Sequence, residues 1–240
     1  MKRIHLILTG LTATIILLSL NRLSNATQGY LMPYEFLRWL DFNAMLPIPL
    51  FSIILYWLLK REIIRDAKDH PFINTTRYTL LTILLISGIY FFGAGSGDHE
   101  VTNYLNFRFC DAGALRNSLC DIITYNDDKF SHIVYYIGFI LMNVSLMLIE
   151  FHLPRKIKIT SKDLILITGN SLFIALGIFA NLAFEEAKLD LIFFGSVMLL
   201  SLYLLFSKKS GTRILPVTYY FASSYTIGVV GTLIYKLFSS

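Results

Sequence analysis

The chain has 240 residues, of which 55% are hydrophobic and only 15% are charged, and its mean hydropathy is +0.60. Soluble domains usually carry about 25% charged residues, so this composition excludes an ordinary soluble protein. The formal net charge is +5. The basic residues nevertheless form short clusters between apolar segments, not the continuous basic stripe that follows a nucleic-acid backbone. We therefore expect a membrane protein with no nucleic-acid partner.

Seven apolar stretches follow one another along the chain. They lie at residues 4–20, 42–59, 78–95, 132–151, 164–183, 189–206 and 214–237. Each is close to the ~20 residues that a helix needs to cross the hydrocarbon core of a bilayer, and the apolar runs are continuous, which favours helices. The sequence predicts an all-α, polytopic bundle of about seven spans. We expect residues 1–240 to form a single integral domain of the plasma or inner membrane.

The loop charges predict an orientation. Basic clusters at 2–3, 60–77, 155–162 and 208–213 hold 14 of the 21 Lys and Arg residues, and all of them fall on one side of the predicted bundle. The other side has seven. Because basic residues concentrate in cytoplasmic loops, we expect the amino terminus in the cytoplasm and the carboxyl terminus on the extracytoplasmic side.

The first span has two interpretations. Lys2 and Arg3 precede the apolar run, and Ser24-Asn25-Ala26 follows it, an order that is typical of a cleaved secretory signal. The apolar run is longer than a usual signal core, which favours an uncleaved anchor. Cleavage would leave six spans without changing the orientation of the others.

Proline residues mark the start of the second span. Pro47 and Pro49 cost little if the helix begins there, and they kink the helix if it begins earlier.

The segment between the third and fourth spans, residues 96–131, is about 36 residues long, whereas connections between packed helices usually have 2–8 residues. Its content is too apolar for disorder. We expect a partly helical cap on the extracytoplasmic side.

Cys110 and Cys120, the only cysteines, lie in this segment. They could form a disulfide in an oxidising compartment, whereas free thiols are expected in the cytoplasm.

The fourth span carries a stripe of polar residues. Asp128 and His132 are four residues apart and therefore share a helix face. At 100° per residue, Tyr136, Asn143 and Glu150 fall within about 40° of His132. Ionisable groups in a span normally face the bundle interior or a water-filled cavity.

Asp98-His99-Glu100 ends the third span at the membrane boundary where Asp128 and His132 begin the fourth. We therefore expect a polar pocket with these candidates: Asp98, His99, Glu100, Asp128, His132, Tyr136 and Asn143. Several chemistries remain open. His99, His132 and Asp128 could bind zinc, iron or manganese, or a carboxylate could orient an imidazole for acid–base work. The same residues could instead be a solvated surface and interhelical hydrogen bonds, as Asn143 suggests. No catalytic residue is identified.

On the last span, Ser224, Gly228 and Thr232 form a row of small residues, which predicts close helix packing.

Two short resemblances add to this interpretation. Residues 128–136, Asp-Lys-Phe-Ser-His-Ile-Val-Tyr-Tyr, resemble a segment of the VanZ-like small polytopic membrane proteins. The resemblance implies that Asp128, Lys129, His132 and Tyr136 are the family positions. Gly95-Ser96, His99 and Asp111 resemble the serine, histidine and aspartate of the alkaline-ceramidase-type seven-span hydrolases, which implies a metal-dependent activity.

The sequence thus favours a membrane protein whose extracytoplasmic pocket binds a small polar or lipid-headgroup ligand. One alternative is an enzyme that uses a divalent metal and acts on a lipid or envelope precursor. Another is an assembly subunit that binds a membrane-protein partner.

Overall fold

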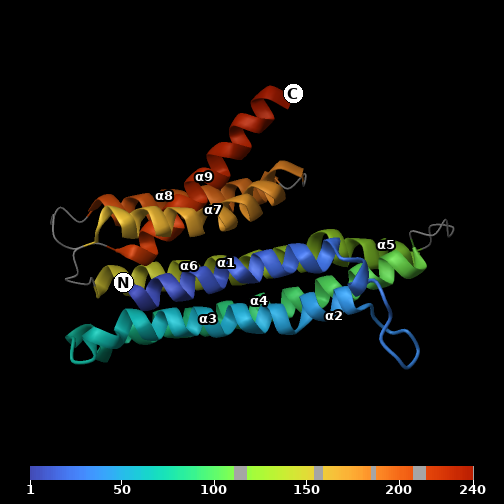
Figure 1. Ribbon diagram of the computed structural model, residues 1–240, viewed down its shortest axis with the longest axis horizontal. Helices are drawn as coiled ribbons and strands as arrows, with labels where there is room; N and C mark the ends of the chain where they lie inside the picture. Colours follow the sequence, from blue (N-terminus) through green and yellow to red (C-terminus); the bar gives the residue numbers. More distant parts are fainter. Residues whose placement is uncertain (111–117, 154–158, 185–187, 208–214, 240) are drawn as a thin grey trace. The chain divides into compact units, whose positions relative to one another are not determined.

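A computed structural model describes residues 1–110, 118–153, 159–184, 188–207 and 215–239. Within these ranges the regular structure is helical, apart from one isolated antiparallel bridge between Tyr30 and Arg38 (Figure 1). The helices are α1 (Lys2–Leu23), α2 (Trp39–Met45), α3 (Pro47–Ile64), α4 (Thr76–Phe109), α5 (Ser118–Tyr125), α6 (Ser131–His152), α7 (Ser161–Phe184), α8 (Lys188–Ser207) and α9 (Pro216–Ser239). Short 3₁₀ turns occur at Asn25–Thr27, Arg65–Ala67 and Pro71–Asn74, and a π turn occurs at Asn126–Phe130.

The expected all-α architecture with seven spans is confirmed. Seven helical segments in the described part of the chain are long and apolar enough to cross a membrane. They are Lys2–Leu23, Trp39–Ala67, Thr76–Phe109, Ser118–His152, Ser161–Ala183, Asp190–Ser207 and Pro216–Phe238. The chain is therefore an integral, multi-pass membrane protein.

The second span begins earlier than its apolar run. Helix α2 starts at Trp39 and ends at Met45, and α3 begins at Pro47. Proline lacks a backbone N–H and clashes with the carbonyl four residues before it. The proline that hydropathy placed inside one span therefore separates two consecutive helices.

The segment 96–131 is helical in both of its described parts, in place of a loop of about 36 residues. Helix α4 continues without a break to Phe109, and helical structure resumes at Ser118 and runs into α6. At 1.5 Å per residue, the 34 residues of α4 extend about 51 Å, well beyond the ~30 Å hydrocarbon core. One end of this helix must therefore project from the core.

The chain forms two compact units. Unit 1 comprises Met1–Ile15, Leu55–Ile83 and Asn143–Ser240, and unit 2 comprises Ile16–Ile54 and Leu84–Met142. Helices α1, α3, α4 and α6 each contribute residues to both units. The helices α7, α8 and α9 belong to unit 1.

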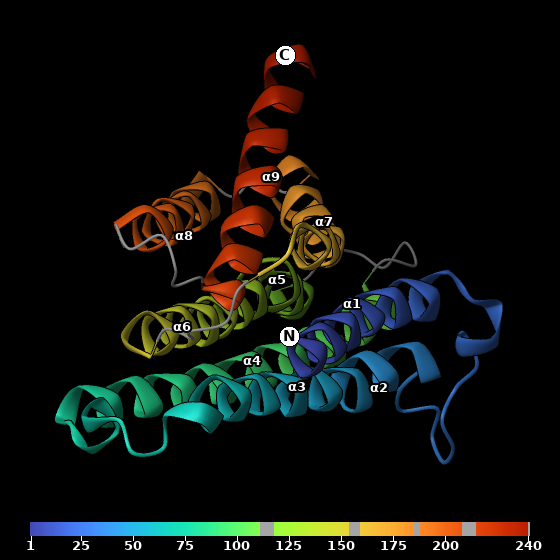
Figure 2. The same cartoon turned by 60° about the vertical axis from the view of Figure 1, so that its left-hand side comes forward.

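Close packing of α7 against α9 organises unit 1, and both ribbon views show these helices side by side (Figures 1 and 2). A Cβ atom added at Gly228 would lie 2.8 Å from the Ile178 side chain and 3.0 Å from the carbonyl oxygen of Ala175. The hydroxyl of Ser224 donates a hydrogen bond to the Ser171 carbonyl at 3.2 Å. The expectation of close packing along this row of small residues is confirmed.

Glu150, near the end of α6, caps the first turn of α9. Its carboxylate accepts hydrogen bonds from the backbone N–H groups of Val217 (3.0 Å) and Thr218 (2.7 Å) and from the Thr218 hydroxyl (2.8 Å). The first backbone N–H groups of a helix lack partners within the helix and carry partial positive charge. The carboxylate therefore serves a structural role in unit 1.

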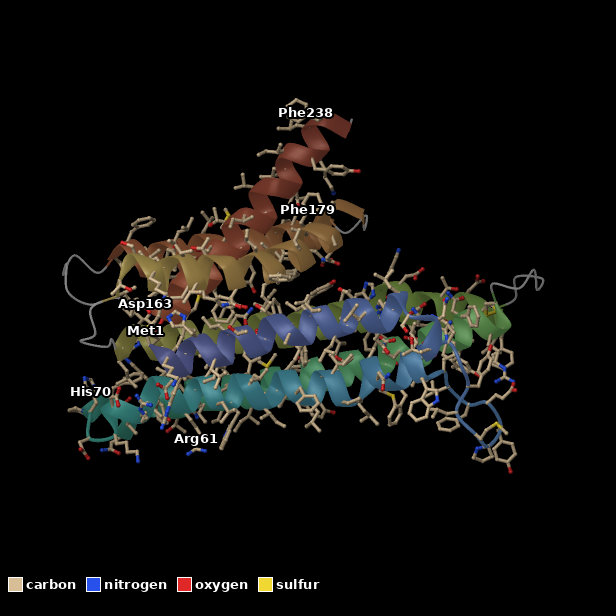
Figure 3. All side chains as sticks on the ribbon, viewed as in Figure 1. Met1, Arg61, His70, Asp163, Phe179 and Phe238 are labelled. Atoms are coloured by element: carbon tan, nitrogen blue, oxygen red, sulfur yellow. A yellow bond between two sulfur atoms is a disulfide. The ribbon has the colours of Figure 1, made fainter. Side chains whose placement is uncertain are left out.

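The first half of α1 is bonded to α7 within unit 1. The imidazole Nε2 of His5 lies 2.7 Å from Oδ1 of Asp163, and the Thr12 hydroxyl donates to the side-chain oxygen of Asn170 at 2.8 Å. Figure 3 labels Asp163 beside Met1, the residue that precedes α1. Ile4 and Leu8 are fully buried. These contacts favour the anchor interpretation of the first span.

We predict that replacing Glu150 by Ala lowers the stability of the protein by about 2–4 kcal/mol, because two buried N–H groups of α9 lose their acceptor. Thermal unfolding in detergent measures this change. Asp69→Ala, which removes an exposed carboxylate, is the matched control and should leave the midpoint unchanged. An equal effect of the two substitutions contradicts the capping role.

We also predict that the mature protein retains α1, because cleavage after Ala26 would remove His5 and Thr12, the α1 partners of Asp163 and Asn170. Intact-mass measurement on protein purified through a carboxyl-terminal tag should include residues 2–26. A mature amino terminus at Thr27 would overturn this prediction.

Candidate functional site

Glycine residues bring α4 and α6 into backbone contact in unit 2. A Cβ atom added at Gly95 would lie 2.6 Å from Cα of Tyr135, and one added at Gly138 would lie 2.7 Å from Cα of Phe92. Both helices lack room for a side chain at these points. The two backbones therefore approach each other closely over about two turns, and the next turn beyond Gly95 carries His99.

His99 lies against residues of the π turn and the start of α6. Its Nδ1 is 3.1 Å from Oδ1 of Asp127, and its ring centroid is 4.6 Å from that of His132. Because a carboxylate only accepts hydrogen bonds, this contact favours the tautomer with the proton on Nδ1. The second oxygen of Asp127 accepts a hydrogen bond from Asn106 at 3.4 Å. Asp127 thus has a close charge contact at Oδ1 and a hydrogen bond at Oδ2.

The π turn explains why Asp127, and not Asp128, faces His99. The backbone N–H of Ser131 bonds to the carbonyl of Asn126, five residues earlier, so the turn holds one more residue than an α-helical turn. Asp127 is 5% exposed, whereas Asp128 is exposed. The expected pairing of Asp128 with His132 on one buried face is corrected: the extra residue rotates Asp128 to the surface and brings Asp127 into the interior.

Ser131 does not form a nucleophilic triad with His99 and Asp127. Its hydroxyl lies 3.5 Å from Nδ1 of His99, the same nitrogen that faces Asp127. In a triad the nucleophile and the carboxylate face opposite ring nitrogens. The hydroxyl also donates to the backbone carbonyl of Asp127 at 2.8 Å, and the residue is fully buried. Ser96, the other serine at this level, donates to the Phe92 carbonyl at 2.8 Å.

Arg22, at the end of α1, reaches Glu100 on α4. Its Nη2 donates to Oε1 of Glu100 at 3.1 Å, and the Glu100 side chain is 5% exposed while that of Arg22 is 45% exposed. Burial of a carboxylate is costly unless a charge partner and hydrogen bonds compensate it. Sequence reasoning missed Arg22, which it treated only as a loop charge.

Three buried carboxylate oxygens of this region accept no hydrogen bond from any described residue. They are Oε2 of Glu100, Oδ2 of Asp98 and Oδ1 of Asp127, and the last of these lies 3.1 Å from Nδ1 of His99. Glu100 interacts electrostatically with His99 and Asp127, and Asp98 with the same two residues. We call the following set the polar cluster: Arg22, Asp98, His99, Glu100, Asp127, Ser131 and His132.

A neighbouring carboxylate in unit 2 is fully bonded. Asp41 accepts from Nε and Nη2 of Arg38, both at 2.8 Å, and from the Arg38 backbone N–H at 3.1 Å. These hydrogen bonds raise the pKa of the Arg38 guanidinium above its usual value. The pair caps the start of α2, so its role is structural.

The remaining candidates divide between the units. Tyr136 is in unit 2, with its ring centroid 6.1 Å from that of His132. Asn143 belongs to unit 1, where it accepts from the Tyr56 hydroxyl at 2.7 Å and donates to the Tyr225 hydroxyl at 2.8 Å. Its amide links three helices. Asp111 lies outside the described residues.

Residues that could hold a metal are sparse in the described ranges. Within those ranges no group of three or more His, Cys, Asp or Glu side chains could hold a metal ion. His99 and His132 are neighbours, but Asp128, the third predicted ligand, is exposed.

Cys110 and Cys120 form a disulfide, with their Cα atoms 5.6 Å apart. The bridge ties the end of α4 to α5. Such bonds persist in oxidising compartments, which agrees with an extracytoplasmic position for this part of unit 2.

Comparison of the chain with protein-family models, curated proteins and solved structures finds no match. The resemblances to VanZ-like proteins and to ceramidase-type hydrolases therefore stay predictions.

We predict that Gly138→Ala lowers the stability of unit 2 by about 1–3 kcal/mol, because the added methyl group forces the α4 and α6 backbones apart. Thermal unfolding in detergent tests this. Gly97→Ala is the matched control, since a Cβ atom there meets nothing within 4 Å, and alanine is the better helix former. A Gly138→Ala midpoint equal to that of the control would refute the close backbone contact.

Proposed function

We propose that the protein is a membrane-embedded receptor or carrier for a small polar molecule or lipid headgroup, which binds at the polar cluster of unit 2. The observation that carries this proposal is the pair of buried, unpartnered oxygens, Glu100 Oε2 and Asp98 Oδ2. A buried acceptor without a donor costs about 1–3 kcal/mol, and more for a charged group. A ligand that donates to these oxygens would remove that cost.

Two other buried carboxylates, those of Glu150 and Asp41, give a standard for comparison. Glu150 accepts three hydrogen bonds and Asp41 accepts three. These two carboxylates, which stabilise helix ends, therefore each accept several hydrogen bonds. Glu100 accepts one bond, from Arg22, and keeps one oxygen free of described partners. The difference supports a binding role for Glu100.

The position of the cluster along α4 also supports binding from the extracytoplasmic side. The apolar run at 78–95 fills much of the hydrocarbon core, so Asp98, His99 and Glu100 fall near its boundary. The distribution of basic residues and the disulfide both favour an extracytoplasmic location for that end of the helix.

A metal-dependent hydrolase is the second candidate, and the contact between His99 and Asp127 favours it. Metal-binding histidines commonly donate their other ring N–H to a carboxylate. Metal analysis of the purified protein separates the two proposals. Stoichiometric zinc, iron or manganese that is lost in His99→Ala and His132→Ala would favour the hydrolase over the binder.

We predict that protein extracted gently from its native membrane retains a polar small molecule or lipid near one equivalent. Glu100→Gln should lower this occupancy about tenfold or more, because the neutral amide presents N–H groups where the ligand needs acceptors. Solvent extraction followed by mass spectrometry measures the occupancy.

Asp128→Asn is the control for this measurement, since it neutralises an exposed carboxylate close to the cluster in sequence, and it should keep the ligand. Size-exclusion profiles show whether each variant is folded. Equal occupancy in Glu100→Gln, Asp128→Asn and the unsubstituted protein counts against a site at this cluster.

A further inference from the structure

We propose that the ligand group bound at the polar cluster is an organic cation with N–H donors, of the primary ammonium type. This inference rests on the proposed function and specifies its ligand. It excludes anionic groups, neutral polyols and quaternary ammonium groups as the recognised moiety.

The charge of the cluster is the first argument. It contains three carboxyl groups, those of Asp98, Glu100 and Asp127, and one guanidinium group, that of Arg22. Three carboxyl groups therefore stand against one guanidinium group, so the cluster is rich in acidic groups. An excess of buried charge is unfavourable in a low-dielectric setting, so a bound cation is favoured and a bound anion is opposed.

The positions of the partners decide which carboxylates remain available. Asp127 contacts His99 on one oxygen and Asn106 on the other. Arg22 occupies only Oε1 of Glu100. The acceptors that remain are Oε2 of Glu100, on a residue that is 4% exposed, and Oδ2 of Asp98.

Hydrogen bonding then selects among cations. Both remaining acceptors are carboxylate oxygens, and the strongest partners of such oxygens are charged N–H donors. A primary ammonium has three N–H groups and can donate to Oε2 of Glu100. A quaternary ammonium has none, and it is usually recognised by aromatic cages. A metal ion needs several ligands close together, and the described residues offer no group of three such side chains.

Ethanolamine and choline are the probes, because they differ only in the methylation of the nitrogen. We expect ethanolamine to raise the thermal-unfolding midpoint of the detergent-solubilised full chain, with an apparent affinity about tenfold or more above that of choline. Ethylene glycol and inorganic phosphate should have no effect.

A second arm compares nanodiscs of phosphatidylethanolamine with nanodiscs of phosphatidylcholine. Stabilisation by free ethanolamine indicates a soluble amine, and stabilisation only in phosphatidylethanolamine indicates a lipid headgroup; either supports the inference.

Glu100→Gln and Asp98→Asn should each weaken the ethanolamine or phosphatidylethanolamine effect about tenfold, while Asp128→Asn should keep it. Two substitutions are used so that misfolding of one leaves the other informative. Equal responses to ethanolamine and choline, no response in either arm, or a response that survives both substitutions would overturn the inference.

The extraction experiment separates this inference from the proposed function. A co-purified ligand that is lost in Glu100→Gln but contains no amine overturns the ammonium inference alone. Absence of any ligand that depends on Glu100 overturns both.

Discussion

The backbone contact between α4 and α6 is the constraint on which the site depends. Gly95 has no room for a side chain because Tyr135 lies against it. One helical turn further, residue 99 on α4 meets residue 131 on α6, so the antiparallel register of the glycine contact continues directly into the polar cluster. Apolar helices gain little from burial against each other in lipid, and small residues permit the close packing that replaces it. The contact that holds unit 2 together thus also fixes the distance of His99 from Asp127.

Two kinds of buried carboxylate occur in this protein, and the difference follows from their neighbours. Glu150 lies beside the start of a helix, where backbone N–H groups are available. Glu100 lies in the middle of α4, where the backbone is already bonded within the helix. It can gain partners only from other side chains, and Arg22 supplies one. A site with spare acceptors therefore arises where a charged residue is placed inside a helix rather than at a helix end.

Hydropathy and loop charge were sufficient to predict the seven spans, because the bilayer fixes the length of each apolar run. They could not predict how far α4 and the helical segment Ser118–His152 continue beyond the length that a span needs, since a projecting helix needs no further apolar residues. They also could not predict the π turn, which has no sequence period of its own. The assumption of 3.6 residues per turn therefore selected Asp128 where the structure buries Asp127. Arg22 was missed for a different reason, because its partner is 78 residues away.

Helix α1 contributes polar contacts to each of the two units. In unit 1 its residues His5 and Thr12 bond to α7, and in unit 2 Arg22 bonds to Glu100 while Asn21 donates to the Leu40 carbonyl at 2.8 Å. Residues 5 and 12 belong to unit 1 and residues 21 and 22 to unit 2, so each unit bonds its own part of α1. The Arg22 side chain is 45% exposed, whereas that of Glu100 is 5% exposed. Within unit 2, the charge that compensates Glu100 is therefore held next to Asn21, a buried residue that is bonded to α2.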